Sequence, residues 1–582
     1  MNCGTAFIYI GRIYMLYILL LSFIAPILVY LTFIFHSRVT KTFAKYGLGI
    51  LVAEAIVYCV VIYFELPSRN ALSILTVNLM LGIVTTLIMS ALTLVINDQG
   101  LVVPRLAAAI LLIILIVFVA GEWHSNFFIK PVAKSVQSTI KKSSQAPTFK
   151  KGVTPVALAP STIKNRMNKN MSKVPNSQYY HLGEIQAQYY HGKPVYIAPV
   201  EFDTIFKYYS AGQATPGYFI IDATSLSAEP KFVKTKLNYT NTSYFNRNAQ
   251  RIMYRHFPSW LVADNSQPQL EIDENGTPYY VQTMYKPIPL SHRVNYSKLH
   301  VVVLNAKTGK AKLYQLKHLP KWIDEGITTE VADSMNQAFG EYQDGWFNFT
   351  FFKKGVQQPT KKNVISTFNN KGEVEYFTDF TNPKTEADSA LGYSMINART
   401  GKLSYYKTSG IMDSDGAADN ANNNYKAQQW TAAMPVIYNI SGHPTWVLSI
   451  LDNTHAFRNY YYINAADQSI HATGDTANEA LENYNQALID GNESSAANTT
   501  NSTKKTLTGT VDRAQITTSD NKSLLLFTLK DDSHQTIYTV QSDDYKSSAL
   551  TQSGDKVSFK VQIENNKAVG YVSNFKNTNF TK

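Results

Sequence analysis

Four long apolar stretches near the amino terminus constrain the fold of this chain most strongly. They cover residues 13–35, 47–65, 71–96 and 101–121. A helix needs about 20 apolar residues to cross the hydrocarbon core of a bilayer, and each stretch is close to or above that length. The first is too long for a signal-peptide core, and further spans follow it. The sequence therefore predicts an uncleaved four-helix transmembrane domain over residues 1–123, embedded in the membrane lipid bilayer.

Two polar side chains, Glu54 and Asn78, lie within the predicted spans. An intramembrane carboxylate is typical of a proton or ion relay. The alternative is that Glu54 hydrogen-bonds to Asn78 or to a neighbouring helix and holds the bundle together. The spans offer a single candidate carboxylate, which favours the structural role.

Positive charge is concentrated directly after the spans. The chain has a net charge of +12, and residues 124–173 hold ten basic and no acidic residues. This Ser-, Lys- and Asn-rich composition predicts a basic tether over residues 124–178 rather than a core-forming segment. Such a tether suits anionic lipid headgroups or an anionic wall polymer. A solvated linker is the equally weighted alternative.

Charge also predicts the topology. The first short loop carries Arg38, Lys41 and Lys45, which favour the cytoplasm, whereas the lysines of the tether oppose this orientation. Because long domains cross the membrane largely regardless of charge, we expect a multi-pass plasma-membrane protein whose large carboxyl-terminal region is extracytoplasmic. Only Cys3 and Cys59 are present, which excludes a disulfide scaffold and fits a bacterial cell envelope protein.

A strand-opening signature recurs four times after the spans, and each copy is followed by an apolar run and a turn. Repeated units of this kind stack to bury a shared core, so an array is expected. The openers are Gly192-Lys193-Pro194-Val195-Tyr196, Gly276-Thr277-Pro278-Tyr279-Tyr280, Gly372-Glu373-Val374-Glu375-Tyr376 and Gly442-His443-Pro444-Thr445-Trp446.

Amphipathic helices separate the repeats. Apolar faces at helical spacing are predicted over residues 245–257, 327–342 and 477–488. Residues 270–284 and 301–315 read as hairpins around Gly276 and Gly309. A helix followed by strands in this way predicts an α+β unit.

The helix, the hairpin and the turns Asn305-Ala306-Lys307-Thr308-Gly309-Lys310 and Asn397-Ala398-Arg399-Thr400-Gly401-Lys402 resemble the PepSY domain. The resemblance is clearest over residues 246–315 and implies a non-catalytic module linked to peptidase restraint or to protein interaction. It makes residues 179–490 a PepSY-like α+β repeat domain.

Residues 153–490 also resemble an uncharacterised family of Gram-positive bacterial polytopic membrane proteins. Four segments carry this resemblance, residues 179–184, 271–279, 319–324 and 439–446. It implies an architecture but no activity.

The carboxyl-terminal end reads as a separate small domain. A Ser/Thr/Asn-rich linker over residues 491–505 precedes five β segments, so residues 506–582 resemble an all-β OB-like barrel. Nine basic and eight acidic residues from Thr506 onward provide no electropositive groove. No nucleic acid partner is therefore expected.

Motifs for catalysis are absent from the sequence, so we predict that the protein is not an enzyme and has no cofactor and no metal. Asp413-Ser414-Asp415-Gly416 could wrap a hard cation, but an ordinary surface loop is favoured. Aromatic residues remain as candidate interaction residues, chiefly Trp322, Trp346 and Trp446, although each could equally lie in the core.

These patterns predict a non-catalytic envelope protein that presents a scaffolding domain for a protein or a wall polymer. The alternative is a PepSY-type regulator or inhibitor of an extracytoplasmic or membrane peptidase.

Overall fold

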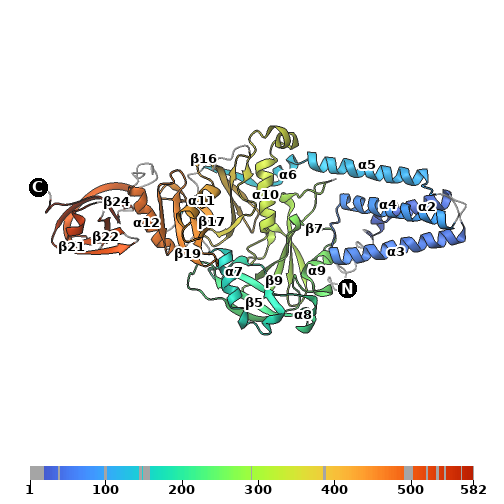
Figure 1. The fold of residues 1–582 in the computed structure, drawn as a ribbon, viewed down its shortest axis with the longest axis horizontal. Helices are drawn as coiled ribbons and strands as arrows, with labels where there is room; N and C mark the ends of the chain where they lie inside the picture. The colour runs from blue at the N-terminus through green and yellow to red at the C-terminus, as the bar shows by residue number, and fades with distance from the viewer. Residues whose placement is uncertain are drawn as a thin grey trace. The chain divides into compact units, whose positions relative to one another are not determined.

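The computed structural model describes residues 17, 19–36, 40–96, 101–142, 147–148, 158–289, 291–383, 389–490, 502–519, 522–532, 536–542, 545–564 and 567–580. These residues belong to two compact units. One comprises Met1–Val436 with Ser449–Arg458, and the other Ile437–Leu448 with Asn459–Lys582. Figure 1 shows apolar helices, β-sheets and a small barrel in chain order.

Four apolar helices pack against one another at the amino-terminal end (Figure 1). Three of them are long and apolar enough to cross a membrane, which confirms three of the predicted spans. The fourth is shorter, and residues 13–16 of its predicted range lie outside the described residues. The helices are α2 (Ile24–His36), α3 (Lys41–Glu65), α4 (Ala71–Ile96) and α5 (Arg105–Phe127).

The boundaries of two spans differ from the prediction for local reasons. Helix α3 begins six residues early because the Thr40 side chain caps it, accepting a hydrogen bond from the Phe43 backbone N–H over 3.1 Å. Lys41 and Lys45 lie in the first turns of α3. These charged residues lower the hydropathy there, so the apolar stretch in the sequence begins later than the helix does. Helix α5 continues to Phe127, past the predicted end at residue 121.

The predicted basic tether is in large part folded, so this prediction was wrong for the described residues. Helix α6 (Lys130–Ser135) buries Val132, and strand β1 (Ser138–Lys142) pairs in parallel with a later strand. Helix α7 (Pro160–Lys169) places Ile163 and Met167 in the core with no exposed surface. The few apolar residues of this segment are spaced so that they reach one core while the lysines stay in solvent.

Four β-sheets follow. Their strand orders are β2-β4-β5-β6, β11-β10-β9-β7, β1-β16-β15-β14-β12 and β17-β18-β19-β20, and β3, β8 and β13 pair with β4, β9 and β14. The first sheet contains β2 (Tyr180–Leu182), β3 (Gln186–Tyr190), β4 (Lys193–Phe202), β5 (Thr215–Asp222) and β6 (Lys231–Leu237). The second contains β7 (Leu261–Val262), β8 (Gln269–Ile272), β9 (Pro278–Tyr285), β10 (His300–Asn305) and β11 (Ala311–Gln315). The third contains β1, β12 (Gln358–Pro359), β13 (Ile365–Phe368), β14 (Val374–Thr381), β15 (Ala390–Asn397) and β16 (Leu403–Ile411). The fourth contains β17 (Thr431–Ile440), β18 (His443–Leu451), β19 (Phe457–Asn464) and β20 (His471–Gly474).

Each opener of the fourfold signature lies between two paired strands of one sheet. The opening glycines Gly192, Gly276, Gly372 and Gly442 have φ values of 79°, 72°, 80° and 88°. A residue with a Cβ rarely adopts this conformation, so glycine sets the reversal of the chain. Each of the four sheets thus contains a hairpin whose reversal is set by a glycine.

Four helices follow the four sheets in turn, and a shorter helix, α8 (Ile205–Ser210), lies inside the first sheet's sequence. Three of them, α9 (Ala249–His256), α10 (Thr329–Glu341) and α12 (Ala477–Asp490), fall in segments predicted to be helical, whereas α11 (Ser414–Asn424) was not predicted. The segment expected as a surface loop at Asp413 instead starts α11. The Asp413 side chain accepts a hydrogen bond from the Gly416 N–H over 2.9 Å and caps the helix.

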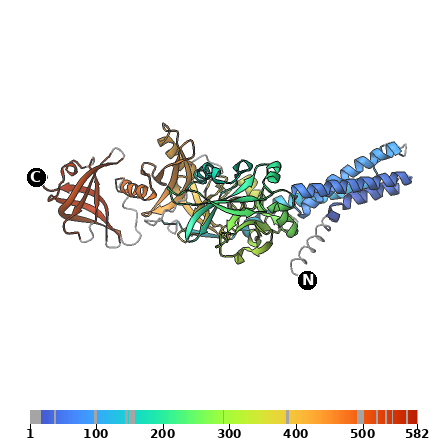
Figure 2. The same ribbon diagram turned by 90° about the horizontal axis from the view of Figure 1, so that it is seen from below.

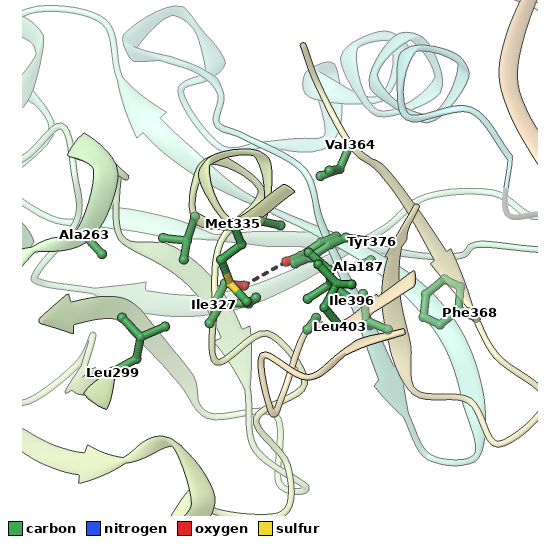
Figure 3. Packing of buried hydrophobic residues seen from close by; sticks show 14 of the residues in the cluster. Ala187, Ala263, Leu299, Ile327, Met335, Val364, Phe368, Tyr376, Ile396 and Leu403 are labelled. Carbon is green, nitrogen blue, oxygen red and sulfur yellow. Dashed lines mark hydrogen bonds between the residues drawn. The ribbon is translucent and has the colours of Figure 1, made fainter. Parts of the chain in front are cut away.

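The largest hydrophobic core joins α6, α7 and α10 to the first and third sheets. At its centre the Tyr376 hydroxyl of β14 donates a hydrogen bond to the Ile327 carbonyl oxygen over 2.9 Å (Figure 3). Met335 of α10 and Ile396 of β15 pack around this pair (Figure 3). A buried hydroxyl with a partner costs little, so the core combines apolar packing with one fixed polar contact.

The carboxyl-terminal residues form a closed five-stranded barrel, drawn in red in Figure 2. Phe527 and Tyr538 are 2% exposed and fill its interior. Residues 491–501 of the predicted linker at 491–505 lie outside the described residues, and residues 502–505 belong to the first barrel strand instead. The strands are β21 (Ser502–Ser519), β22 (Lys522–Leu529), β23 (Tyr538–Gln541), β24 (Lys556–Glu564) and β25 (Lys567–Asn577).

Candidate functional site

A cavity of about 600 Å³ lies where the apolar helices meet the second sheet and α10. Its wall is rich in hydroxyl, amide and charged groups from segments far apart in the sequence. It is lined by Phe64 and Glu65 of α3, Leu66, Ser68 and Asn70 after α3, Val132 of α6, Gln250 and Tyr254 of α9, Trp260–Val262, Asp264, Asn265, Gln267, Tyr285, His292–Val294, Tyr296, and Ser334, Gln337, Ala338 and Tyr342 in or just after α10.

One side of the cavity is the short connection between α3 and α4, which α9 holds in place. The Arg69 guanidinium donates to the Tyr254 carbonyl oxygen over 2.7 Å, and the Tyr254 hydroxyl donates to the Pro67 carbonyl oxygen over 2.9 Å. Arg251 donates to the carbonyl oxygen of Tyr63 over 2.9 Å. Charge-assisted bonds of this kind fix the connection against α9.

A second side is held by the end of α5. The Ser125 hydroxyl lies 2.9 Å from the Ser291 hydroxyl and 3.0 Å from His292 Nδ1. Arg293 donates to the Ser125 carbonyl oxygen over 3.4 Å and to the Asn126 side chain over 3.2 Å. The loop that lines the cavity is therefore fastened to a membrane-spanning helix.

Asp264 is the central acidic group of the wall. Its backbone has φ 48°, and the next residue, Asn265, has φ 54°. Two successive left-handed residues that are not glycine cost conformational energy, and such strain gathers at functional sites. Burial raises the pKa of Asp264 to about 6, while hydrogen bonds from Ser334 and Tyr296 oppose the shift. Near neutral pH this carboxyl group can accept or donate a hydrogen bond.

Aromatic rings border the same cavity. The Lys286 ammonium lies 4.9 Å from the Trp260 ring centre, and the His300 ring lies 4.1 Å from that of Trp260. Tyr285 also lines the cavity, and its hydroxyl donates to the His292 carbonyl oxygen over 3.1 Å. Flat rings beside hydroxyl and amide groups suit a polar ligand with some apolar faces, such as a sugar ring or a peptide.

None of the tryptophans singled out from the sequence lines this cavity. Trp446 has no exposed surface, so of its two predicted roles, interaction residue or core residue, the structure supports the core. Trp322 is half-buried against Tyr279, at 4.7 Å between ring centres. Trp346 is half-buried at the end of α5, where its ring centre lies 4.3 Å from that of Phe127.

The two polar residues of the spans have structural partners. Glu54 Oε2 accepts a hydrogen bond from the Thr85 hydroxyl of α4 over 2.8 Å. Asn78 accepts from the Ala25 N–H over 2.8 Å and donates to the Leu21 carbonyl oxygen over 2.8 Å. Glu54 therefore bonds to a neighbouring helix, one of the two partners expected for a structural role, and not to Asn78.

A buried acidic cluster lies between the first three sheets. Both oxygens of Glu271 accept backbone N–H bonds, from Asp324 over 2.8 Å and from Glu325 over 3.1 Å. Burial raises the pKa of Glu271, and the nearby Asp324 carboxyl group adds to this shift. Burial also raises the pKa of Glu325, with further contributions from the Glu271 and Asp324 carboxyl groups. The described residues contain no group of three or more His, Cys, Asp or Glu side chains that could hold a metal ion.

The cavity residues were missed from the sequence because they come from separated segments with no motif. Trp260 is not one of the three tryptophans named as candidates, and no motif marks Asp264 or Tyr296. The only local signal is Asp264-Asn265, since Asp and Asn are the residues other than glycine that most readily adopt left-handed backbone.

No protein-family model matches the chain, and no curated protein sequence matches it. Solved structures give only distant likenesses. A GH43_1 enzyme from Xanthomonas citri is 10% identical with a TM-score of 0.18, covering 66% of this chain and 94% of that one. A putative glycoside hydrolase from Bacteroides ovatus is 11% identical with a TM-score of 0.17, covering 69% and 97%. A GH32 beta-fructofuranosidase from Bombyx mori is 9% identical with a TM-score of 0.16, covering 71% and 69%. Likenesses at these scores carry no argument about the function of this chain.

Proposed function

We propose that the protein is a non-catalytic, multi-pass protein of the cell envelope that binds a hydroxyl-rich wall polymer outside the membrane. The cavity at the junction of the spans and the second sheet is the observation that carries the proposal. It is large enough for one or two sugar-sized units, and its wall offers both hydrogen-bonding groups and aromatic rings.

The folded domains support a binding role. Each of the four sheets is built on a glycine-reversed hairpin, and helices separate them, which supports the PepSY-like assignment. The barrel has the strand order β21-β22-β23-β25-β24 with β23 and β25 parallel, which supports the OB-like assignment. Both are modules that bind rather than catalyse.

The arrangement of the helix ends supports an extracytoplasmic repeat domain. The connection after α3 and the end of α5 both contact the repeats, through Arg69 and Ser125. Lys41 and Lys45 lie at the start of α3, which is the opposite end of that helix. Positive residues favour the cytoplasmic side, so the repeats are assigned to the outer side.

Charged groups of both signs on the wall favour a ligand that carries hydroxyl groups as well as phosphate groups. Arg293 and His292 lie near Asp264 and Glu65, so opposite charges face the same space. A polymer of alternating hydroxyl and phosphate groups satisfies both, because Arg293 pairs with a phosphate while Asp264 and Tyr296 bond to hydroxyls. Such polymers are expected outside a Gram-positive membrane.

A binding measurement on the full-length protein in lipid nanodiscs tests the proposal. Short poly(glycerol phosphate) and a muramyl disaccharide peptide serve as probes, with titration calorimetry as the readout. We expect saturable binding of at least one probe, weakened about tenfold by Asp264→Asn or Tyr296→Phe, since each removes roughly one hydrogen bond. Trp322→Phe, outside the cavity, is the matched control. Absence of binding, or equal binding by all variants, contradicts the proposal.

Regulation of a peptidase is the second candidate. Strand β11 is at the edge of the second sheet, with three half-buried and two exposed residues. An extended segment of a partner protein can add to such an edge. Deletion of the protein would then change the activity of one envelope peptidase and leave the wall composition unchanged, whereas loss of a polymer-binding protein changes the wall.

A further inference from the structure

An exposed aromatic segment lies beside the end of the last spanning helix. It runs from Trp346 to Phe352 and includes a single π-helical turn, η8 (Asn348–Phe352). Phe347 and Phe351 are 62% and 63% exposed, values far above those of core residues. Exposed aromatic rings in a cluster mark an interaction surface, because water contact with so much apolar area is unfavourable.

The segment is held rigidly rather than left as a loose loop. The Asn348 side chain donates to the Lys354 carbonyl oxygen over 2.9 Å and accepts from the Lys354 N–H over 3.1 Å. The half-buried Phe349 packs edge-on against Tyr342 of the segment after α10, at 5.3 Å between ring centres. One face of the turn is thus anchored inward, which fixes Phe347 and Phe351 outward.

The outward face continues directly from α5. The Phe127 ring, at the last residue of the helix, lies 4.3 Å from Trp346 and 5.9 Å from Phe347 between ring centres. One turn earlier Trp123 is 65% exposed, and the adjacent Phe128 is 52% exposed. A 23-residue helix spans about 35 Å, so these aromatics lie where a membrane-crossing helix leaves the hydrocarbon core.

We propose that Trp346–Phe352 inserts into the interfacial layer of the bilayer that α5 crosses, as a second attachment that does not span the membrane. Aromatic side chains prefer this layer because their rings tolerate both acyl chains and headgroups. The exposed Lys353 and Lys354 follow at once and reach headgroup phosphates. Continuity with α5 selects lipid as the occupant, and this inference does not depend on the ligand of the cavity.

Depth-dependent quenching tests the insertion. The full-length protein, with Cys3 and Cys59 replaced by serine, carries an NBD label on Phe351→Cys and is reconstituted in phosphatidylcholine liposomes. Part of the lipid is brominated either near the headgroup or near the methyl end of the acyl chain. We expect shallow bromines to lower the emission by at least about twofold and deep bromines to act weakly, as for a side chain in the interface.

Ile140→Cys is the matched control, since Ile140 is an apolar side chain that is 72% exposed on β1. Its label should respond to neither lipid. Thermal unfolding of both labelled proteins must match that of the unlabelled one. Equal emission from the Phe351 label with and without bromine overturns the proposal. So does a change in emission that follows protein concentration instead of lipid, since a second copy would then cover the segment.

Discussion

The guanidinium carbon of Arg69 lies 3.4 Å from the centre of the Tyr254 ring, and the same group donates to the Tyr254 carbonyl oxygen. Arg69 belongs to the connection between two spans, and Tyr254 belongs to α9. The contact therefore joins the transmembrane bundle to the repeat domain by both a cation–π interaction and a charge-assisted hydrogen bond.

Arg69→Ala should loosen this junction. A cation–π contact with a desolvated arginine and a charged hydrogen bond together contribute on the order of 2 kcal/mol. We expect a lower unfolding temperature in nanodiscs and faster exchange of amide hydrogens in residues 249–256. Arg255→Ala, on the exposed face of the same helix, should change neither. Unaltered exchange in Arg69→Ala would show that the junction is held elsewhere.

Stability should fall as the pH rises towards neutrality, because buried carboxyl groups prefer their neutral form. Burial raises the pKa of Glu201 to about 7, with a hydrogen bond from Tyr280 opposing the shift. The folded state thus holds a proton that the unfolded chain releases near pH 4.5. This contribution to the free energy of unfolding is complete below pH 4.5 and is lost as the pH rises through 7, and it amounts to on the order of 2–3 kcal/mol.

Glu201→Gln isolates that contribution, because the amide oxygen still accepts the Tyr280 hydrogen bond. Denaturant unfolding between pH 4.5 and pH 8 should show a shallower decline for the variant than for the wild type. Glu229→Gln removes an exposed carboxyl group and should leave the wild-type slope. Parallel curves for Glu201→Gln and wild type would mean that Glu201 ionises normally in the folded protein.

Glu54→Gln should preserve the helix bundle. The amide oxygen can accept the Thr85 hydrogen bond, while the cost of burying a carboxylate disappears. We expect an unfolding temperature in detergent equal to or above that of the wild type, and a lower one for Glu54→Ala. A large loss of biological activity with an intact fold would instead indicate a relay through the spans.

Trp446→Ala should destabilise the protein by about 3–5 kcal/mol, as truncation of a fully buried aromatic side chain does. Trp322→Ala, at a half-buried position, should cost clearly less. Urea unfolding followed by the fluorescence of the remaining tryptophans measures both. Equal costs would place the two side chains in equivalent environments.

The orientation is open to chemical labelling. In a background without Cys3 and Cys59, the exposed Ser227→Cys should react with a membrane-impermeant thiol reagent in intact cells. Lys41→Cys, at the far end of α3, should react only after permeabilisation. The reverse pattern would place the repeats in the cytoplasm and remove the wall polymer as a partner.

The sequence predicted best what is encoded locally. Long apolar runs identified the spans, and glycines such as Gly276 and Gly372 marked the hairpins because their positive φ is a local requirement. The prediction of a basic tether was wrong because the fold of that segment depends on long-range contacts. Val132 and Ile163 become buried only through contact with strands far along the chain. The composition of a short sequence segment does not reveal such long-range contacts.

The candidate site was beyond local patterns altogether. Its wall combines the connection after α3 with Asp264, Arg293 and Tyr296. These residues come from segments far apart in the sequence, and they lie close together only in the folded protein. Trp446 illustrates the same difficulty for the core. Trp446 belongs to one of four similar strand openers, yet it has no exposed surface. The elements that pack on a strand decide whether its side chains are buried, and the sequence of the strand alone does not show them.

The parallel pairing of β1 with β16 has a mechanical consequence. The amino-terminal end of β1 leads back to the membrane, and the carboxyl-terminal end of β16 leads onward to the fourth sheet and the barrel. Tension along the chain between the spans and the barrel would pull these two strands in opposite directions along their length. The backbone hydrogen bonds along the five paired positions from Ser138 to Lys142 would then resist the force at the same time. They would not break one after another from one end.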